Sequence, residues 1–357
     1  MIVLMILIFL IIIFSLPFTY ALIIRPDKKI LNKNYFPKIS IIVPAHNEEK
    51  NIKRKIKELL SINYPKNNFE IIVVDDFSND NTKKICKLFF NRIKYIKLSK
   101  KSGKIGAINR GLSNASNDII VITDADTKLN SNSIKKLVRN FINSDIGAVN
   151  GTLKISKRKD WISQIEDSYV KQMNKFLFSA SNKKSVIFLY GQLCAFRKSI
   201  IKKIRTDAAV DDIEIALKVL NKGRGVIQEP TAIVYEEAPL NLNQLLRNKI
   251  RRTVCSIEVM LKYLGLLNPK RGLVSITLLT YRIIPLLSPL LLFSIIILSI
   301  IILNYVILYA ILFFIFIFIL LKPKFSIHFL IMQIIVIISW FAFFFKRIPI
   351  GASWKNK

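Results

Sequence analysis

Residues 119–127 form an apolar run that ends in two carboxylates one residue apart, Ile119-Ile120-Val121-Ile122-Thr123-Asp124-Ala125-Asp126-Thr127. Four consecutive β-branched residues bounded by polar turn residues are typical of a buried strand in a parallel α/β sheet. In open sheets of that kind, ligands bind just beyond the carboxyl ends of the strands. The stretch therefore predicts that Asp124 and Asp126 lie where a ligand would bind.

The residue types at these two positions point to a metal ion. Carboxylates are hard oxygen donors that suit Mg²⁺ or Mn²⁺, and such ions keep waters and take their remaining ligands from substrate phosphates. An isolated Asp-x-Asp also occurs by chance, and a polar turn after a strand explains it about equally well. The rest of the chain has to decide between a metal site and a turn.

Three other segments repeat the pattern of a strand that ends in polar residues. The run 39–43 leads into Pro44 and then Asn47, which can cap a helix whose first turn is acidic. A strand at about 70–74 ends in Asp75-Asp76, and one at about 93–98 leads into a stretch rich in lysine and glycine. Four strand–helix alternations predict a doubly wound α/β sheet that binds a nucleotide. The dinucleotide fingerprint and the phosphate-loop motif are both missing, which argues against an oxidoreductase.

The formal net charge of +32 has two explanations. It fits an anionic partner, but isoleucine, lysine and asparagine are used heavily everywhere, which indicates a compositional bias. The lysines match no nucleic-acid-binding motif, so we predict no nucleic-acid partner. The three cysteines (Cys86, Cys194 and Cys255) match no metal-ligand spacing and are typical of reduced packing residues, and two histidines make a histidine-rich zinc site unlikely.

Both ends of the chain are apolar. Met1 to Ile24 contains no charged residue and predicts a transmembrane anchor, and the basic flank 25–33 places the next domain in the cytosol. From Leu273 onward there is no Asp or Glu, and three apolar stretches predict spans at about 281–303, 305–321 and 325–345. Three spans would leave the basic C-terminus outside, against the positive-inside rule, so one stretch is re-entrant or the count differs.

The predicted order is an anchor (1–24), a cytosolic domain (25–252), an interfacial amphipathic helix (253–272) and a C-terminal transmembrane region (273–357). Two helical stretches, 160–180 and 253–267, have apolar residues at helical spacing. Either can be a core helix or lie in the bilayer surface, and the position of 253–267 just before the spans favours the surface.

Several of these segments occur in the order and spacing of membrane-anchored family 2 glycosyltransferases. The matching segments are Pro44 to Glu49, Val74-Asp75-Asp76, Lys101 to Leu112 and Asp124-Ala125-Asp126. The chain resembles the group of hyaluronan, chitin, cellulose and poly-N-acetylglucosamine synthases over about 39–256. The resemblance implies a nucleotide-diphospho-sugar transferase domain of the GT-A type, followed by transmembrane helices.

The resemblance also implies site residues. Asp126, with Asp124, matches the metal-binding motif, and Asp212 in Val210-Asp211-Asp212-Ile213-Glu214 matches the catalytic base. The residues implied to contact the donor nucleotide are Pro44, Asn47, Glu48, Asp75, Lys104, Asp124 and Arg251. Those implied on the acceptor side are Gly191, Phe196, Arg197 and Asp211. Taken alone, Asp211 and Asp212 are equally typical of a helix start, and both roles are compatible.

The chain departs from the family's Gln-x-x-Arg-Trp motif, where it reads Asn248-Lys249-Ile250-Arg251-Arg252. Arg251 matches, but Asn248 replaces Gln and Arg252 replaces the Trp that meets the acceptor in polymerising synthases. Arg247, Lys249 and Arg252 could equally lie against lipid headgroups.

The expected function is metal-dependent, inverting transfer of a hexosyl or N-acetylhexosaminyl group from a nucleotide sugar, with UDP as the nucleotide, to a hydroxyl of a lipid-linked or glycan acceptor. An alternative is a processive polysaccharide synthase that also translocates its product. A membrane transport or structural protein that binds a nucleotide without turnover is a further alternative. Few ionisable residues lie in the apolar stretches, which argues against transport. The expected location is the cell membrane, in contact with its lipids, and the oligomeric state is left open.

Overall fold

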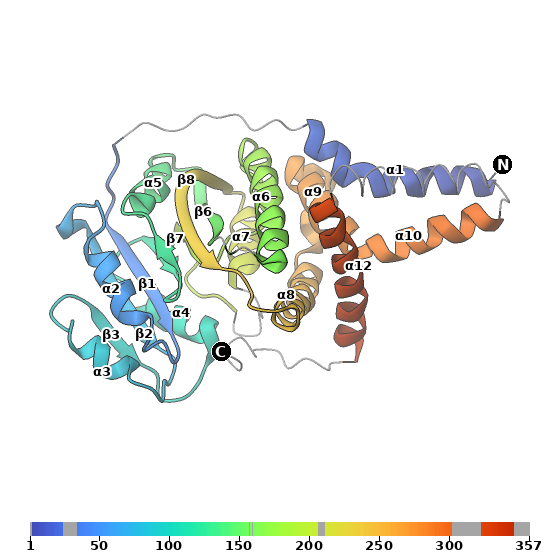
Figure 1. Cartoon of the computed structure of the whole chain (residues 1–357). Coiled ribbons are helices and arrows are strands. Elements are labelled where there is room, and N and C mark those ends of the chain that lie inside the picture. The colour runs from blue at the N-terminus through green and yellow to red at the C-terminus, as the bar shows by residue number, and fades with distance from the viewer. Residues whose placement is uncertain are drawn as a thin grey trace.

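The computed structural model describes residues 2–23, 34–156, 158, 160–205, 211–301 and 323–345. In these residues one mixed sheet runs in the order β3-β2-β1-β4-β7-β6-β8-β5, with helices packed on both of its faces. The apolar helices lie together at the opposite end of the molecule from β3 (Figure 1). The predicted α/β domain of the GT-A type with apolar C-terminal helices is confirmed.

The first half of the sheet is parallel, as the sequence predicts. Its strands are β1 (Ile39–Ala45), β2 (Phe69–Asp75), β3 (Lys94–Lys97) and β4 (Ile119–Thr123). Ile39 pairs with Phe69 on one side and with Ile119 on the other, so the carboxyl ends of β1, β2 and β4 meet at one edge. Every residue of β1 and β4 is buried, because helices cover both faces of these central strands.

The second half of the sheet has mixed directions. It consists of β5 (Lys128–Leu129), β6 (Ile146–Ser156), β7 (Leu193–Arg197) and β8 (Gly225–Glu237). β7 is antiparallel to β4, so Leu193 lies opposite Thr123 and Arg197 lies opposite Ile119. β7 therefore starts at the edge where β4 ends and runs away from it.

The helices around the sheet are α2 (Ile52–Leu60), α3 (Thr82–Lys87), α4 (Gly103–Asn114), α5 (Ser133–Val138), α6 (Trp161–Ser181) and α7 (Asp211–Asn221). Short 3₁₀ turns cover Lys66–Asn68, Arg139–Ile142, Leu264–Leu267 and Pro269–Arg271. α4 packs closely on β1, because a Cβ atom at Gly111 would lie 2.6 Å from Cγ2 of Ile42. This contact holds the C-terminal half of α4 against the middle of β1.

One predicted helix cap is wrong. α2 begins at Ile52 after Asn51, and Asn47 lies five residues earlier with a positive φ of 55°. Asparagine tolerates this left-handed conformation, and the Asn47 side-chain oxygen accepts a hydrogen bond from the backbone amide of Asn79 at 3.0 Å. Asn47 therefore joins the loops after β1 and β2 instead of starting a helix.

The remaining helices are apolar or amphipathic: α1 (Ile2–Ile23), α8 (Leu242–Lys262), α9 (Leu273–Leu278), α10 (Ile284–Ile301) and α12 (Pro323–Phe344), with a π-helical turn at Leu279–Ile283. Among the described residues, two segments are long and apolar enough to cross a membrane, by length and composition: Leu273–Ile301 and Ile327–Phe344. α1 has 22 residues, a length of about 33 Å. The predicted span at 305–321 and the basic residues at 25–33 lie outside the described residues.

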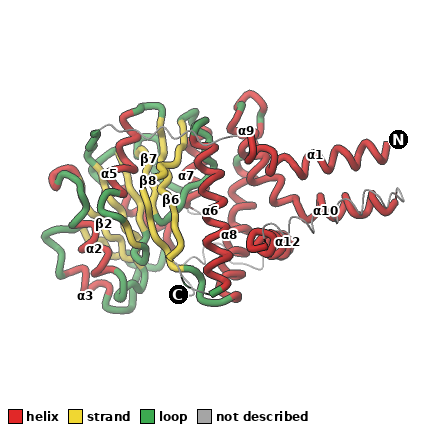
Figure 2. The backbone as a smooth tube through the Cα atoms, turned by 45° about the horizontal axis from the view of Figure 1, so that its top comes forward, coloured by secondary structure: helices red, strands yellow, loops and turns green. Residues whose placement is uncertain are grey.

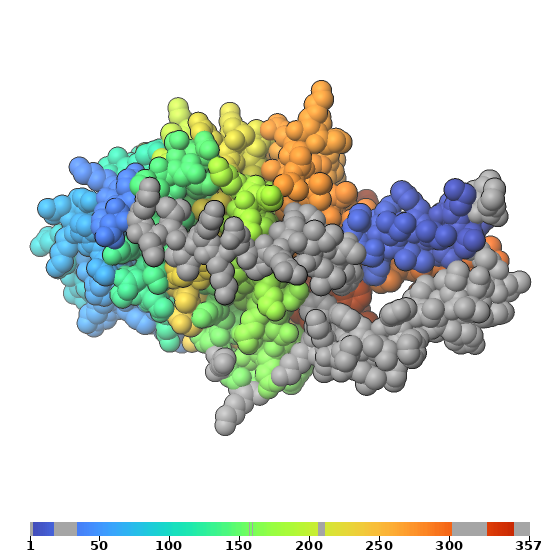
Figure 3. All heavy atoms as spheres, turned by 90° about the horizontal axis from the view of Figure 1, so that it is seen from above, coloured from blue at the N-terminus to red at the C-terminus, as the bar shows by residue number. Residues whose placement is uncertain are grey.

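The apolar helices do not form a parallel bundle. α1 and α10 lie side by side and extend away from the sheet domain (Figures 1 and 3). α12 runs crosswise to them and packs against α6 and α8 (Figure 2). The predicted spans 281–303 and 325–345 overlap the two apolar segments, and the predicted number of spans stays a prediction.

The predicted separate helix at 253–272 is also different in the structure. α8 runs without a break through position 253 and ends at Lys262. Its C-terminal half buries Val254, Ile257, Val259 and Met260, and α8 contacts α7 and α12. These apolar side chains pack against protein, so the predicted domain boundary falls inside a helix that belongs to the folded body.

Candidate active site

Three segments far apart in the sequence meet at the ammonium group of Lys104. The Lys104 Nζ atom, in the first turn of α4, lies 2.7 Å from Oδ1 of Asp124, directly after β4. The same Nζ atom lies 3.7 Å from Oδ2 of Asp211, the first residue of α7. A Cβ atom at Gly191 would lie 2.9 Å from this Nζ atom, so the glycine leaves room for it. The structure therefore brings together Lys104, Asp124, Gly191 and the start of α7.

Asp212 lies beside this group, in the first turn of α7. Burial and the neighbouring Asp211 carboxylate raise the pKa of Asp212 to about 6. Its Oδ1 atom accepts a hydrogen bond from the amide of Ile213 at 2.8 Å, and its backbone carbonyl accepts one from the amide of Leu189 at 3.3 Å. A fixed carboxylate with a pKa close to neutral suits the acceptance of a proton from a hydroxyl group.

Asp211 is held differently from Asp212. It is buried, and its Oδ2 atom has no hydrogen-bond partner in the described part of the chain. The 3.7 Å approach of Lys104 is the ion pair that compensates its charge there. Whether it contacts an acceptor stays a prediction.

Asp124 and Asp126 fit a divalent cation that takes further ligands from its substrate. In the described residues no group of three or more His, Cys, Asp or Glu side chains gathers in a metal-binding cluster. Burial raises the pKa of Asp124 against the opposing effect of Lys104, and the Asp126 charge raises it further. A cation between the two carboxylates would relieve that repulsion, and two hard oxygen donors leave positions open for phosphates and water.

Arg54 on α2 holds the loop that carries these carboxylates, and sequence reasoning missed it. Its guanidinium donates to the carbonyl oxygen of Thr127 at 2.9 Å and to that of Asp126 at 3.0 Å. The Thr127 hydroxyl donates to the Asp124 carbonyl at 2.9 Å. An arginine on an exposed helix face gives no local signal for such a contact.

The predicted donor-binding residues near β1 and β2 mostly hold the loops together. Asp75 is fully buried, and its two oxygens accept hydrogen bonds from the Ser78 amide at 2.8 Å and the Tyr95 hydroxyl at 2.5 Å. Asp76 accepts from the amides of Ser102 and Gly103, which fixes the start of α4. Contact between Asp75 and a nucleoside base stays a prediction, and it requires the Tyr95 hydroxyl to move.

Pro44 and Glu48 are also internal. Pro44 lies in β1 opposite Val74, and the side chain of Glu48 accepts a hydrogen bond from the Asn51 amide group at 2.8 Å. The Glu48 backbone amide donates to the Thr82 hydroxyl at 2.9 Å. Both residues shape the edge of the sheet, and their contact with a donor stays a prediction.

Phe196 and Arg197 do not lie on the acceptor side, and the prediction for them is wrong. Phe196 is fully buried in β7 between Ile120 and Ala148. Arg197 lies opposite Ile119, at the far edge of the sheet, where it donates to the carbonyl of Ile146 at 3.0 Å. The antiparallel direction of β7 explains both positions, since it leaves Gly191 and Gln192 at the site and carries the following residues away.

A second polar group that sequence reasoning missed lies around Glu236, near the end of β8. Its Oε2 atom accepts a hydrogen bond from Gln192 Nε2 at 2.8 Å, and its Oε1 atom lies 4.0 Å from Arg252 Nη2. Burial lowers the pKa of Arg252, but the carboxylates of Glu236 and Asp212 outweigh this and raise it overall. Arg252, at the position of the family's Trp, therefore lies beside Glu236, and the charge of Asp212 also raises its pKa. Phosphate contact by Arg251 stays a prediction.

Comparison with known proteins assigns this site to a family. The model of glycosyl transferase family 2 matches residues 40–205. A probable glycosyltransferase YdaM of Bacillus subtilis is 29% identical over 249 residues, which is 66% of this chain and 59% of that protein. A poly-beta-1,6-N-acetyl-D-glucosamine synthase of Staphylococcus aureus is 27% identical over 256 residues, 70% of this chain and 61% of that protein. The chain thus spans about three fifths of the length of these relatives.

Solved structures show the same fold. A mannosyltransferase, PcManGT from Pyrobaculum calidifontis in complex with GDP-Man and Mn²⁺, superimposes with a TM-score of 0.72 and 21% identity, and the match covers 99% of this chain and 100% of that one. Residues 40–205, which the family model matches, contain the strands and loops that carry Lys104, Asp124, Asp126 and Gly191. The chain therefore carries a glycosyl transferase family 2 domain over residues 40–205.

Proposed function

We propose that the chain catalyses metal-dependent, inverting transfer of a sugar from a UDP-sugar to a hydroxyl of a lipid-linked or glycan acceptor at the cytosolic face of a membrane. The observation that carries the proposal is the convergence of Asp124, Lys104 and the Asp211-Asp212 pair at one edge of the sheet. A transferase needs a place for a diphosphate and, opposite it, a base for the incoming hydroxyl. This edge offers both.

Asp212 is the proposed base. Its raised pKa leaves it ionised at neutral pH and able to take a proton as the acceptor oxygen attacks the anomeric carbon. Direct displacement by that oxygen inverts the configuration, so an α-linked donor gives a β-linked product. Lys104 pairs with Asp124 at 2.7 Å, and its positive charge stabilises the ionised form of Asp212.

Asp124 and Asp126 would hold Mg²⁺ or Mn²⁺, which neutralises charge on the departing nucleoside diphosphate. Arg54 keeps their loop in place through the carbonyl groups of Asp126 and Thr127. The mannosyltransferase of the same fold is in complex with Mn²⁺, which supports a divalent ion here. It is also in complex with GDP-Man, so the donor test has to include guanosine nucleotides.

Membrane association supports an acceptor that is itself at the membrane. Arg282, in the interior of the segment Leu273–Ile301, lies near the site. Its guanidinium is 4.5 Å from the ring of Phe188, and the amide of the next residue, Leu189, donates to the Asp212 carbonyl. Processive synthesis is the second candidate, because the relative from Staphylococcus aureus is named a polymer synthase. Arg252, in place of the family's Trp, favours short products.

The test measures nucleoside diphosphate release from a panel of UDP- and GDP-sugars by membranes that contain the full chain, with Mn²⁺, Mg²⁺ or EDTA and native lipid extract. We expect one sugar to turn over with metal, and Asp212→Asn to reduce turnover by about 10²- to 10⁴-fold, the usual range for loss of a general base. Asp167→Asn, which removes a carboxylate on α6 that pairs with Lys171, is the control and should retain activity. Equal turnover by both variants, or a product that retains the donor's configuration, would contradict the mechanism.

A further inference from the structure

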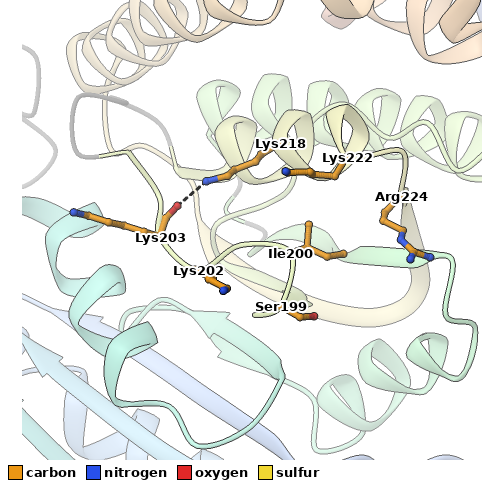
Figure 4. Close-up of a pocket in the computed structure, with 7 residues that line it drawn as sticks. All are labelled: Ser199, Ile200, Lys202, Lys203, Lys218, Lys222 and Arg224. Atoms are coloured by element: carbon orange, nitrogen blue, oxygen red, sulfur yellow. Dashed lines mark hydrogen bonds between the residues drawn. The ribbon is translucent and has the colours of Figure 1, made fainter.

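A hollow of about 530 Å³ lies between the turn after β7 and the end of α7 (Figure 4). Five of its lining residues are positively charged, Lys202, Lys203, Lys218, Lys222 and Arg224, and we refer to this set as the basic hollow. Within the described residues its lining includes no carboxylate. The basic hollow is therefore a concave, strongly positive surface.

The basic hollow is separate from the active site. α7 begins with Asp211 at the active site, and Lys222 follows the other end of this 11-residue helix, about 16 Å away. The turn after β7 follows Arg197, which lies at the edge of the sheet opposite the one that carries Asp124. The positive residues of the hollow consequently have no part in binding the donor's diphosphate.

Most of this positive charge has no acidic partner among the residues that the structure describes. Among the described residues, the basic hollow takes part in one ion pair, which joins Arg224 Nη1 to Asp145 Oδ1 at 3.9 Å. Lys218 Nζ donates to the backbone carbonyl of Lys203 at 2.8 Å, which is a neutral partner. Lys218 and Lys222 are four residues apart on one face of α7 and repel each other.

Two ordinary explanations apply to single residues of this set. Lysines near a helix C-terminus interact favourably with its dipole, which accounts for Lys218 and Lys222. Exposed lysines also cover any soluble surface. Neither explanation accounts for the basic residues that line the same hollow from other elements, Lys202, Lys203 and Arg224. An anion in the hollow would offset the repulsion among the cations that reach it.

The basic hollow lies next to the start of a candidate membrane span. The end of α7 contacts the turn Pro269–Arg271 through a hydrogen bond from Arg271 Nη2 to Asn221 Oδ1 at 3.5 Å. The segment Leu273–Ile301 begins two residues after Arg271. Figure 3 shows the region around residue 220 (yellow) beside the region around residue 270 (orange) on one face of the molecule. Basic residues at the end of a span lie at the depth of lipid headgroups.

We propose that the basic hollow binds the phosphate group of an anionic lipid headgroup where Leu273–Ile301 enters the bilayer. A phosphate offers several acceptor oxygens to cations that come from three elements at once. A soluble phosphate compound has the same chemistry, and the contact with the start of the span favours the lipid. The proposal needs the chain to be in a membrane, but it does not depend on sugar transfer.

The test is photocrosslinking of the full chain in phosphatidylcholine vesicles that contain either photoreactive phosphatidylglycerol or photoreactive phosphatidylcholine. The readout is the amount of lipid attached to peptides from 198–224, measured by mass spectrometry. The variant Lys202→Gln/Lys203→Gln/Lys222→Gln removes three exposed cations of the basic hollow. The control Lys83→Gln/Lys84→Gln/Lys87→Gln removes three exposed cations from α3, so both variants have the same net charge.

We expect phosphatidylglycerol to label these peptides in the wild type and in the α3 control, and labelling to fall about tenfold or more in the hollow variant. Photoreactive phosphatidylcholine should label them weakly in all three chains. Equal labelling of the two triple variants, or labelling that ignores lipid charge, would overturn the proposal. Loss of labelling when millimolar inorganic phosphate is present during irradiation would also overturn it, because the site would then belong to a soluble phosphate ligand. Lipid attachment is read without turnover, so an inactive enzyme leaves the result interpretable.

Discussion

The Lys104 ammonium lies 2.7 Å from the Asp124 carboxylate and also faces Asp211, so one side chain of α4 connects the end of β4 to the start of α7. The Asp124 and Asp211 charges raise the pKa of Lys104 despite its burial, so the lysine stays charged. Its charge in turn lowers the pKa of Asp212 against the larger effects of burial and Asp211. The pKa of Asp212 therefore depends on a residue in another element.

Lys104→Met should change both the rate and its pH dependence. Without the cation the pKa of Asp212 rises above its value of about 6, and the fall in activity at acid pH should begin at higher pH. Loss of the charged contact should lower kcat/KM by about ten- to a hundredfold. Lys100→Met, at an exposed position just before α4, is the control. An unchanged pH profile in Lys104→Met would show that the ammonium group does not act on the base.

The wild-type enzyme should lose activity as the pH falls through about 6. The pKa of Asp212 lies above the ordinary range of aspartate, mainly because the side chain is buried. A general base accepts a proton only in its ionised form. Below its pKa the ionised fraction falls tenfold for each pH unit, so log(kcat/KM) should drop with a slope close to one. A profile measured with saturating metal that stays flat to about pH 4.5 would assign proton acceptance to another group.

Asp126→Asn should raise the Mn²⁺ concentration that activity requires. Its effect on donor binding measured in EDTA should be smaller. The substitution removes one of two carboxylates available to the ion, so half-maximal activity should need on the order of a hundredfold more Mn²⁺. A Mn²⁺ titration of nucleoside diphosphate release measures this. Asp145→Asn removes an exposed carboxylate next to Lys184 and should leave the titration unchanged. If both variants respond to Mn²⁺ alike, the ion is held elsewhere.

Arg252→Met should affect the acceptor more than the donor. Arg252 lies 4.0 Å from Glu236, and its charge lowers the pKa values of Glu236 and Asp212. Its loss should raise the acceptor KM about tenfold, with a smaller change in the donor KM. Arg252→Trp restores the residue of the polymerising relatives and should lengthen the products, as judged by mass spectrometry. Arg247→Met, at an exposed position of the same helix, serves as the control. A shift in the donor KM alone in Arg252→Met would contradict the placement of Arg252 on the acceptor side.

The ion pair between α6 and α8 should be sensitive to the loss of one partner. Lys249 Nζ lies 3.0 Å from Glu166 and 3.7 Å from the ring centre of Tyr169, and both charged side chains are buried. Lys249→Met leaves a buried carboxylate without its cation and should destabilise the fold by about 3–5 kcal/mol. The double variant Lys249→Met/Glu166→Gln should recover much of that loss. Thermal unfolding in one detergent measures both, and equal losses in the single and double variants would refute the pairing.

The sequence predicts the parts of the fold in which local pattern and position agree. The β-branched run before Asp124 and the alternation of strands and helices lead to the parallel half of the sheet. The order of motifs points to Asp212, which lies beside the group around Lys104, and its role as base stays a prediction. The direction of β7 is not a local property, because an apolar five-residue strand pairs either way. The prediction for Phe196 and Arg197 fails for this reason, although the nearby Gly191 does lie at the site.

Side-chain contacts between distant segments are the other gap. Arg54, Glu236 and Gln192 hold the site through partners more than 40 residues away, and nothing in their neighbourhood in the sequence marks them. Asn47 shows the opposite case, in which a residue typical of a helix cap adopts a left-handed conformation to join two loops. A tertiary contact overrides local propensity there.

The short connection before β7 joins the base to the apolar helices. The Leu189 amide binds the Asp212 carbonyl, Phe188 packs under Arg282, and the Ser185 hydroxyl contacts that of Thr277 at 3.2 Å. A truncated protein that ends at Gly272 would lose Thr277 and Arg282 and expose the apolar side chains of α6 and α8 that α12 covers. The sheet domain and the apolar helices are thus joined by direct contacts, and we expect them to unfold together. A water-soluble fragment would not reproduce the activity of the intact enzyme. Detergents that disturb the packing of α9 and α12 would inactivate the intact enzyme without contacting a catalytic residue.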